Sequence, residues 1–324
     1  MTAPAVSVVI CTYNRLRMLE AAITSCLRDA TRRGTAYEII IADNSPSGHA
    51  EALVQRLNAS GGPVPVRWAP ASPPNISIAR NAGIRAAAAP LVAFLDDDLE
   101  VEPGWLDHFM DVMASTGAHV AVGPVRPRFA AGAPPAWDPA GSRFTRVLAL
   151  PTGSRVFAGT GNAVKFAIST ASSIWRRDRC FTDPAPFDPA FGASGGEDLD
   201  LFLRLERRGC RFVWCAEAGV WETVPDGRVA LGYSVLRAYS GAQVYAAATI
   251  RNAAAPRRRG LDIMARGVLQ TVGSGVALAP FAALKALGGD ASRYNKALFG
   301  ASSGLGKLLW WRKVPLYHVE KPPV

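Results

Sequence analysis

The 324-residue sequence has few cysteines and histidines, and what it lacks excludes several classes of protein. The five cysteines are odd in number and form no CxxC pair, which argues against a zinc site or a disulfide framework and indicates reduced thiols in the cytosol. No series of apolar segments of about 20 residues is present, which excludes a polytopic membrane protein. The N-terminal residues have no basic start followed by an apolar core, so no secretory signal is expected.

Positive charge is concentrated at the C-terminal end. Twelve Lys and Arg but only three Asp and Glu lie in 251–324, so this segment carries +9 of the net charge of +10 and 1–250 is close to neutral. Its residues 267–284 are uncharged and lie between Arg266 and Lys285. A basic apolar tail of this kind favours an anionic partner, a membrane or a nucleic acid, and flanking cations favour an interfacial or re-entrant helix over a span. The alternative is a helical subdomain that packs on the rest of the protein.

Strand-like and helix-like patterns alternate over the first 125 residues. Short β-branched runs predict strands, and apolar residues at helical spacing predict helices, at these positions: strands 6–12, 37–45, 65–70, 90–98 and 118–125; helices 15–30, 49–59, 76–89 and 105–116. Such alternation predicts an α/β fold, Rossmann-like, with a mostly parallel sheet flanked by helices. Residues 126–192 predict loops and short strands. A helix follows Gly195, a strand covers 211–217, and 228–252 is helical.

Acidic residues follow two of the predicted strands. Asp43 ends one, and three consecutive acids, Asp96, Asp97 and Asp98, end another. In parallel sheets ligands bind at the carboxyl ends of the strands. Adjacent carboxylates repel one another unless a cation or hydrogen-bond donors compensate, and Mg²⁺ or Mn²⁺ prefers a few carboxylates together with phosphate oxygens. The cluster therefore predicts a metal–diphosphate site. The alternative for Asp98 is a cap for the helix that begins near Trp105.

A second acidic pair, Glu197 and Asp198, follows two glycines at the start of a predicted helix. Ser194 and Glu197 match a capping box, so Glu197 has an alternative role in holding the helix N-terminus. Asp198 is not needed for that cap. A carboxylate fixed at a helix N-terminus stays ionised and is a candidate general base.

Five segments together resemble the family 2 glycosyltransferases, which have the GT-A fold. The segments, which fall within residues 5–250, are VSVVICTYNR (6–15), Asp43-Asn44-Ser45, NISIARNAGIRAA (75–87), AFLDDD (93–98) and SGGEDLDLFLRLERRG (194–209). Other segments resemble the bacterial exopolysaccharide glycosyltransferases of the succinoglycan glucosyltransferase type: GPVRPRF (123–129), PPAW (134–137), TGN (160–162), FDPAFGASGGEDLDLF (187–202) and VWETVPDGR (220–228).

The resemblance implies a role for each matching residue. The substrate-binding set is Thr12, Tyr13 and Asp43 at the nucleotide base, Arg80 at the nucleotide or diphosphate, Asp96 at the ribose, and Asp97 beside it. Asp98 would bind Mg²⁺ or Mn²⁺, and Asp198, supported by Glu197, would be the catalytic base. Many family members have a His where this sequence has Glu222, which we expect to be a second metal ligand. The alternative for Glu222 is a solvated loop acid.

The resemblance also implies an activity and an organisation. We expect an inverting transferase that moves a sugar from a nucleotide-sugar, UDP-glucose or a similar hexose donor, to a polyprenyl-diphosphate-linked saccharide. Residues 1–125 would form the nucleotide-sugar-binding half and 126–250 the acceptor-binding and catalytic half. Residues 251–324 would form a helical tail associated with the inner-leaflet membrane surface. The expected location is cytoplasmic, peripheral or monotopic at the inner membrane.

Other classes of protein fit the sequence less well. A Rossmann dehydrogenase needs a Gly-rich turn after the first strand, where this sequence has CTYNR. A nucleic-acid partner is not expected, because no recognised binding module is present and the aromatic residues do not interleave with the basic tail. Two alternatives remain open: an enzyme of the same fold that loads sugar onto polyprenyl phosphate, and a catalytically silent scaffold of a polysaccharide-assembly complex.

Overall fold

The computed structural model describes residues 3–29, 34–62, 64–157 and 168–314. The expected TGN motif, 160–162, lies outside these residues. The chain divides into two compact units, which are described separately. The sheet unit is Met1–Arg128, Phe144–Pro189 and Arg204–Thr223; the helical unit is Phe129–Arg143, Ala190–Leu203 and Val224–Val324. The functional division expected at 125/126 and 250/251 stays a prediction.

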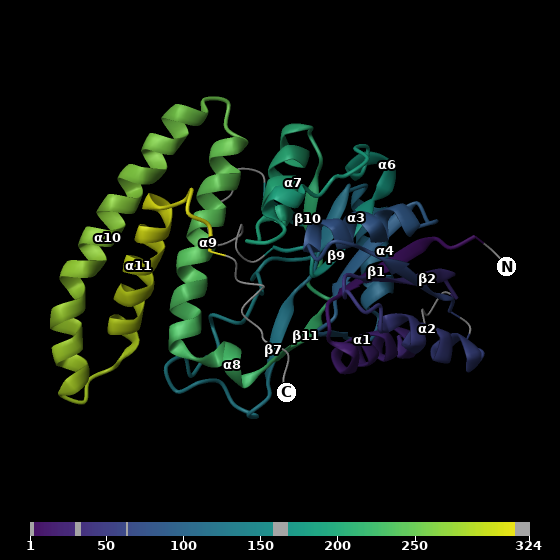
Figure 1. The fold of residues 1–324 in the computed structure, drawn as a ribbon, viewed down its shortest axis with the longest axis horizontal. Helices are drawn as coiled ribbons and strands as arrows, with labels where there is room; N and C mark the ends of the chain where they lie inside the picture. The colour runs from purple at the N-terminus through teal and green to yellow at the C-terminus, as the bar shows by residue number, and fades with distance from the viewer. Residues whose placement is uncertain (1–2, 30–33, 63, 158–167, 315–324) are drawn as a thin grey trace. The chain divides into compact units, whose positions relative to one another are not determined.

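The sheet unit is built on an eight-stranded sheet with the order β3-β2-β1-β4-β9-β6-β10-β8 (Figure 1). Its strands are β1 Val6–Thr12, β2 Tyr37–Asp43, β3 Val66–Pro70, β4 Leu91–Asp96, β6 Val120–Val122, β8 Arg155–Val156, β9 Ser172–Arg176 and β10 Phe212–Trp214. Strands β1 to β4 pair in parallel, as do β6 and β10. Every residue of β1 and β2 is buried, which is the pattern of a parallel sheet covered on both faces.

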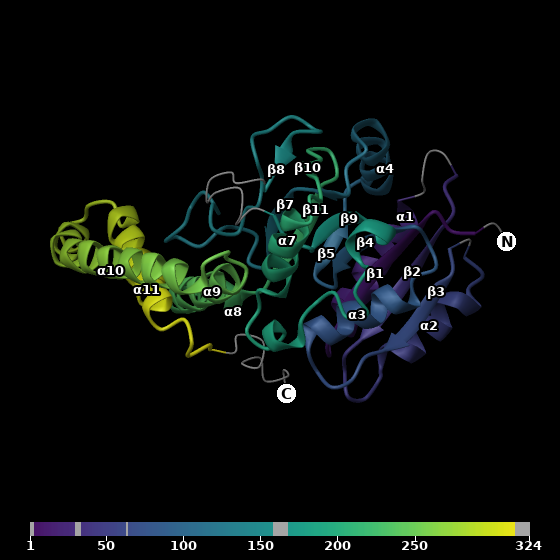
Figure 2. The same ribbon diagram turned by 90° about the horizontal axis from the view of Figure 1, so that it is seen from above.

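Helices pack against this sheet (Figure 2). They are α1 Leu16–Arg28, α2 Ala50–Ala59, α3 Ile76–Ala86, α4 Trp105–Thr116 and the short α6 Arg177–Cys180. In α1 the buried side chains Leu19, Ala22, Ile23 and Cys26 recur at the three- and four-residue spacing of one helix face. All five cysteines are free and buried. The α/β fold with helices on a mostly parallel sheet is confirmed.

The sequence predicted short strands within 126–192, but it did not predict the position of β9 or its place in the sheet. This strand pairs antiparallel with both β4 and β6 and so occupies the middle of the sheet. A second sheet of three strands has the order β5-β11-β7, formed by β5 Leu99–Val101, β11 Val220–Val224 and β7 Val125–Phe129. Strand β5 follows the three acids directly, and Thr223 N of β11 donates to Asp98 O at 2.9 Å. The small sheet therefore holds the acidic turn.

The helical unit consists mainly of long helices (Figure 1). These are α9 Leu231–Arg251, α10 Pro256–Ala286 and α11 Ser292–Leu308, preceded by the 3₁₀ turn η1 Pro189–Phe191 and the short helix α8 Asp226–Val229. Helix α11 packs on both α9 and α10. Gln243 of α9 donates to the carbonyl oxygens of Leu309 and Arg312, at 2.8 and 2.6 Å, and ties the end of the tail to α9. Helix α7 Glu197–Arg207 begins in the helical unit and ends in the sheet unit.

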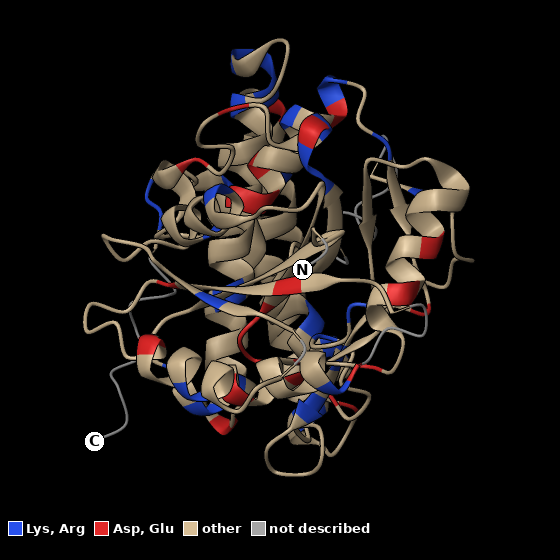
Figure 3. Cartoon of the chain, turned by 90° about the vertical axis from the view of Figure 1, so that its right-hand side faces the viewer, with Lys and Arg blue, Asp and Glu red and all other residues tan. Residues whose placement is uncertain are grey.

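Charge and hydropathy are distributed as the sequence indicates. Figure 3 views the right-hand side of Figure 1, where Lys and Arg are interspersed with Asp and Glu. Within the described residues, α10 is long and apolar enough to cross a membrane by length and composition, and only 6% of its most apolar stretch is buried. A core helix of a soluble protein can be equally long and apolar but is mostly buried, whereas this stretch of α10 is exposed.

Candidate functional site

The parallel register of the sheet unit brings the predicted residues to one edge. Thr12 at the end of β1 is paired with Asp43 of β2, and Cys11 is paired with Asp96 of β4. Thr12 Oγ1 donates to Asp97 Oδ2 at 2.8 Å, so the ends of β1 and β4 are joined by a buried hydrogen bond. Tyr13 follows with its side chain exposed. The predicted residues therefore lie together at the carboxyl ends of the strands, and their role in binding a ligand stays a prediction.

Asp43 is buried and shapes the loop between β2 and α2. Its Oδ1 accepts from Ser45 N at 2.9 Å, and its Oδ2 accepts from Ala50 N and from Trp68 Nε1, both at 3.2 Å. The carboxylate therefore fixes the backbone around Asn44. The role at the nucleotide base that the resemblance implies stays a prediction.

Arg80 projects from α3 toward the acidic cluster. It is buried, its Nη2 lies 3.6 Å from Asp96 Oδ1, and its guanidinium lies over the ring of Phe187. The polar face of α3 also clamps the following segment: Asn81 exchanges two hydrogen bonds with the backbone of Phe187, and Ser77 Oγ donates to Asp188 O. The segment NISIARN thus positions one cation and one loop.

The three acids are crowded. Burial first, and then the neighbouring charges of Asp98 and Glu222, raise the pKa of Asp96, against the opposing effect of Arg80. Burial and the charge of Asp98 raise the pKa of Asp97 to about 7. Arg15 compensates in part, with its Nη1 3.4 Å from Asp97 Oδ1 and 3.6 Å from Asp98 Oδ2. The carboxylates of the cluster repel one another, and a bound cation would reduce this repulsion.

This repulsion makes a stability prediction for Asp97→Asn. Because the pKa of Asp97 is about 7 in the folded protein and ordinary when unfolded, the wild type loses stability as the pH rises from about 4 to 7. The variant keeps an acceptor for Thr12 and lacks the charge. Without metal or nucleotide it should be more stable by on the order of 2 kcal/mol above pH 7, with the difference vanishing near pH 4. Urea unfolding against pH measures this; Asp111→Asn, an exposed change on α4, is the control. Equal pH profiles for Asp97→Asn and wild type would contradict it.

Glu222 of β11 forms an ion pair that the sequence did not predict. Its Oε2 accepts from Arg146 Nη2 at 3.1 Å, and both side chains are largely buried. Among the described residues, Arg146 Nε is a buried donor with no hydrogen-bond partner. Both charges act on the pKa of Asp96, Arg146 lowering it and Glu222 raising it. The expected metal role of Glu222 stays a prediction, and the acid is not a solvated loop residue.

The donor set can be compared with what a metal needs. Within the part of the chain that the structure describes, no group of three His, Cys, Asp or Glu is arranged to hold a metal ion by itself. Asp96 and Asp98 repel each other electrostatically. Mg²⁺ is typically bound through one or two carboxylates, with substrate phosphates completing the shell. The residues therefore fit a metal that arrives with a diphosphate.

The cap alternative for Asp98 is excluded. The residue before α4 is Gly104, and its N–H donates to Asp29 Oδ1 at 2.6 Å, while Leu106 N donates to Asp29 Oδ2 at 3.4 Å. Asp29 therefore caps this helix. Asp98 lies in the acidic cluster, with its Oδ2 3.6 Å from Arg15 Nη1.

Glu197 and Asp198 begin α7 in the helical unit. Gly195 and Gly196 precede them with φ of 82° and 92°, a backbone that favours glycine. A Cβ at Gly196 would lie only 3.3 Å from Val244 Cβ, so the backbone here packs closely on α9. Glu197 is buried, whereas Asp198 is partly exposed. Asp198, the partly exposed acid of the pair, therefore follows a backbone segment that packs tightly against Val244.

Two neighbours of this pair have structural roles. Ser194 Oγ donates to Phe191 O at 3.5 Å, which shapes the turn before the helix. Asp200 is fully buried, accepts from Asn252 Nδ2 at 2.8 Å and lies 3.9 Å from Arg251 Nε. Asp200 thus ties α7 to the end of α9. Asp198 Oδ1 accepts from Leu199 N at 2.7 Å, and its role as catalytic base stays a prediction.

The predicted residues therefore form two groups. The sheet unit brings together the substrate and metal set, Thr12, Tyr13, Asp43, Arg80, Asp96, Asp97, Asp98 and Glu222, and the helical unit holds Glu197 and Asp198. Sequence reasoning missed Arg15 and Arg146. Arg15 was within reach, because it directly follows the first strand's CTYN; Arg146 lies in an irregular segment far from its partner and gives no spacing signal.

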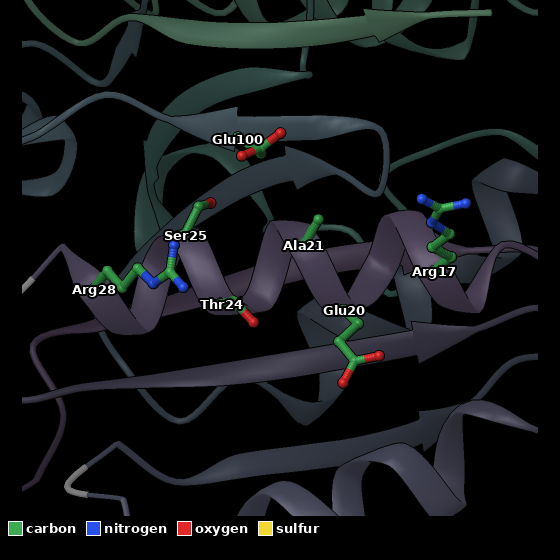
Figure 4. A pocket seen from close by; sticks show the side chains of 7 residues that line it. All are labelled: Arg17, Glu20, Ala21, Thr24, Ser25, Arg28 and Glu100. Carbon is green, nitrogen blue, oxygen red and sulfur yellow. The ribbon is translucent and has the colours of Figure 1, made fainter. Parts of the chain in front are cut away.

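A shallow pocket on α1 contains none of the predicted residues (Figure 4). Its volume is about 320 Å³, and its lining mixes both signs of charge: Arg17, Glu20, Ala21, Thr24, Ser25, Arg28 and Glu100. It shares no side chain with the site above.

Comparisons with known proteins agree with this geometry. The family model described as glycosyl transferase family 2 matches residues 7–171. The chain is 30% identical over 236 residues to the succinoglycan biosynthesis protein ExoM of Rhizobium meliloti (strain 1021), covering 73% of this chain and 72% of that protein. It is 24% identical over 245 residues to chondroitin synthase of Escherichia coli, covering 68% of this chain and 35% of that enzyme's length.

Solved structures show the same fold. S. aureus TarS in complex with UDP-GlcNAc superposes with a TM-score of 0.53 at 14% identity, covering 79% of this chain and 69% of that one. TarS in complex with UDP gives 0.53 at 13% identity, covering 93% and 90%. The predicted resemblance is confirmed, and the chain belongs to glycosyltransferase family 2.

Proposed function

We propose that the chain is a metal-dependent inverting hexosyltransferase that extends a polyprenyl-diphosphate-linked saccharide in cell-surface polysaccharide synthesis. The observation that carries the proposal is the edge of the sheet unit, where the Asp96–Asp98 cluster faces Arg80 and the Arg146–Glu222 pair. Carboxylates that need a cation, beside arginines that can neutralise phosphate, are the groups that a nucleoside diphosphate requires. The names of ExoM and chondroitin synthase support a role in polysaccharide synthesis.

A UDP-sugar is the proposed donor. The TarS structures bind UDP-GlcNAc and UDP on the same fold, which supports uridine as the base. Thr12, Tyr13 and Asp43 would hold the base. Asp96 and Asp97 would lie at the ribose, and Asp98 would bind Mg²⁺ or Mn²⁺. UDP-glucose is the preferred hexose donor by resemblance to the succinoglycan enzymes.

The reaction follows from these groups. When bound, the divalent metal neutralises charge that grows on the departing diphosphate. Arg80 binds the same anion from its buried position on α3. Asp198 accepts the proton of an acceptor hydroxyl, which attacks the anomeric carbon opposite the leaving group, and the configuration inverts. Glu197 supports the base. Positioning and electrostatics supply most of the rate.

Calorimetric binding of UDP, GDP and dTDP tests the donor site. With Mn²⁺ present, UDP should bind tightly and the other two weakly, and EDTA should abolish the binding because the metal joins carboxylates to diphosphate. Failure of all three nucleotides to bind in either condition would reject the donor site and favour the scaffold. Transfer of sugar to polyprenyl phosphate itself, in an assay with that acceptor, would favour the lipid-loading alternative.

The acceptor and the location follow from the tail. The net +9 charge of 251–324 and the exposed α10 support association with an anionic inner-leaflet surface, where a lipid-linked saccharide is presented. The enzyme would then work on the cytoplasmic side as a peripheral or monotopic protein.

Arg146 and Glu222 make a separate prediction. We propose that Arg146 binds the diphosphate and that Glu222 holds Arg146, in place of the metal role expected from the sequence. Arg146→Gln should weaken UDP binding by about 10- to 100-fold, because a charge-assisted hydrogen bond is lost. Glu222→Gln should weaken it less and leave the half-saturating Mn²⁺ concentration unchanged. Calorimetry with UDP and with uridine measures both.

Arg128→Gln is the matched control, because Arg128 pairs with Glu100 at an exposed position of β7. It should leave UDP binding unchanged. A large increase in the Mn²⁺ requirement of Glu222→Gln would restore Glu222 as a metal ligand. Equal losses of UDP and uridine binding in Arg146→Gln would show that Arg146 does not act on the diphosphate.

A further inference from the structure

Helix α10 presents its large apolar side chains to the outside. The most exposed of them are Leu261 (69%), Leu269 (74%), Val272 (59%) and Val276 (73%). A helix that packs on a soluble core turns such side chains inward, because each one removed from water contributes about 1.5–3 kcal/mol. Within the described residues, the exposed side chains of α10 are not buried, so they do not contribute this free energy to folding.

The inner face of α10 carries the apolar Ile263, which packs with Ala246 and Ile250 of α9, and is small and polar where it meets α11. Figures 1 and 2 both show α10 and α11 side by side. At their contact a Cβ on Gly267 would lie 3.0 Å from Gly304 O, and a Cβ on Gly304 would lie 2.7 Å from Thr271 N and 2.9 Å from Gly267 O, so the two helices approach closely through these glycines. Thr271 bonds back to Gly267 O at 2.8 Å, and Lys307 donates to Gln270. Where α10 meets α11, the contact is made by small and polar residues, and the apolar residues of α10 face away from it. Helices in lipid pack in this way.

The charges show how such a helix would lie. The uncharged stretch 267–284 is about 27 Å long at 1.5 Å per residue. Before it stand Arg257, Arg258, Arg259 and Arg266, and after it Lys285, Arg293 and Lys296. A hairpin inserted end-on would bury one of these groups in hydrocarbon at a cost of several kcal/mol. A helix that lies in the plane of the bilayer keeps both groups at the headgroups.

A groove lies beside the basic residues that follow the uncharged stretch, where the lipid headgroups would be. It lies between the C-terminal half of α10 and the N-terminal half of α11 and has a volume of about 670 Å³. Phe281 and Phe299 line it, together with Arg293 and Lys296. An apolar lining with two cations is complementary to an anionic lipid.

We propose that the outer face of α10 lies in the acyl-chain region of an anionic bilayer, parallel to its surface, with the basic residues at both ends on lipid phosphates. The inference deepens the proposed membrane location and rests on it. It names the inserted face and its orientation. The occupant is the bilayer, and a second copy of the chain on this face is an outcome that the test would detect.

The test uses the full chain and vesicles of phosphatidylcholine with or without phosphatidylglycerol. Replacing Leu269, Val272 and Val276 together with Gln should lower vesicle partitioning by at least about 100-fold. These side chains are exposed, so the fold should persist. Val147→Gln, an exposed apolar change in the sheet unit, is the matched control and should leave partitioning unchanged. Replacing Arg257, Arg258 and Arg259 with Gln should cost about 100-fold on anionic vesicles only.

Orientation needs a separate readout. A nitroxide attached at Val276→Cys, with the five native cysteines buried, should be shielded from a water-soluble relaxation agent on vesicles, and one at Ser292→Cys should not. Unchanged partitioning of the triple variant, or an accessible label at 276, would overturn the proposal. Loss of self-association instead of vesicle binding, seen by sedimentation velocity, would overturn it in favour of a second copy. UDP binding of the triple variant separates this result from failure of the donor site.

Discussion

Replacing Asp198 with Asn is expected to lower sugar transfer by about 100- to 10,000-fold, the range that general bases contribute. Asn is of similar size and cannot take the proton of the acceptor hydroxyl. The helix around it should persist, because the tie to α9 is made by Asp200 and the turn by Ser194. UDP binding should be unchanged, since the residues proposed to bind the donor lie on the sheet unit. Single-turnover transfer and UDP calorimetry on the same sample measure the two effects.

Asp226→Asn is the matched control for this variant. Asp226 is an exposed carboxylate in the first turn of α8, as Asp198 is in the first turn of α7, and its replacement should leave transfer unchanged. Near wild-type transfer by Asp198→Asn would remove Asp198 from the role of base. In that case Glu197→Gln would be the next variant, since Glu197 is the other acid of the pair.

The second large effect is expected at Asp98. Asp98→Asn removes the carboxylate proposed to bind the metal and should lower transfer on the order of 1000-fold, because stabilisation of the leaving diphosphate is lost. The backbone contact of Asp98 O with Thr223 N does not depend on the side chain, so the turn should remain. In contrast to Asp198→Asn, this variant should lose the part of UDP binding that EDTA abolishes and retain binding of uridine.

Glu100→Gln, two residues along in β5, controls for a change of charge near the site. Glu100 pairs with Arg128 at a half-exposed position. It should keep EDTA-sensitive UDP binding. If Asp98→Asn kept that binding too, the metal would be held elsewhere.

The first half of the chain was largely predictable from its sequence, because its strands are covered on both faces and its helices are amphipathic. Both patterns are local, and α4 was predicted to the residue. Short strands were predicted over 126–192, but the position of β9 was not. Its sequence SSIWR contains no long apolar run, and its place between β4 and β6 depends on pairing with distant residues.

The site residues were predictable where acidic residues are consecutive in the sequence. Asp96, Asp97 and Asp98 stand together, and Glu197 and Asp198 follow paired glycines. Their partners could not be found in the same way. The Arg146–Glu222 pair joins residues 76 positions apart, and its geometry depends on two loops and a short strand. Asp200 is as acidic as its neighbours in the sequence, and only burial distinguishes its structural role.

The tail shows a third limit. Composition predicted its helices and its basic charge. The sequence could not decide which face of α10 packs, because Gly, Ser, Thr, Leu and Val alternate along 267–284 without a charged face to orient the helix. The close contact of Gly267 with Gly304 settles that orientation within the helical unit.

An enzyme bound by α10 in the plane of a membrane would encounter its lipid-linked acceptor by diffusion within that plane. The relevant acceptor concentration is then the number of molecules per area of lipid, and the volume of the suspension has no influence once the enzyme is bound. Adding inert anionic lipid at a fixed amount of enzyme and acceptor would slow the reaction by spreading both over more surface. Exposed leucines and valines on one helix would thus set the kinetic order of a reaction whose chemistry takes place on other elements.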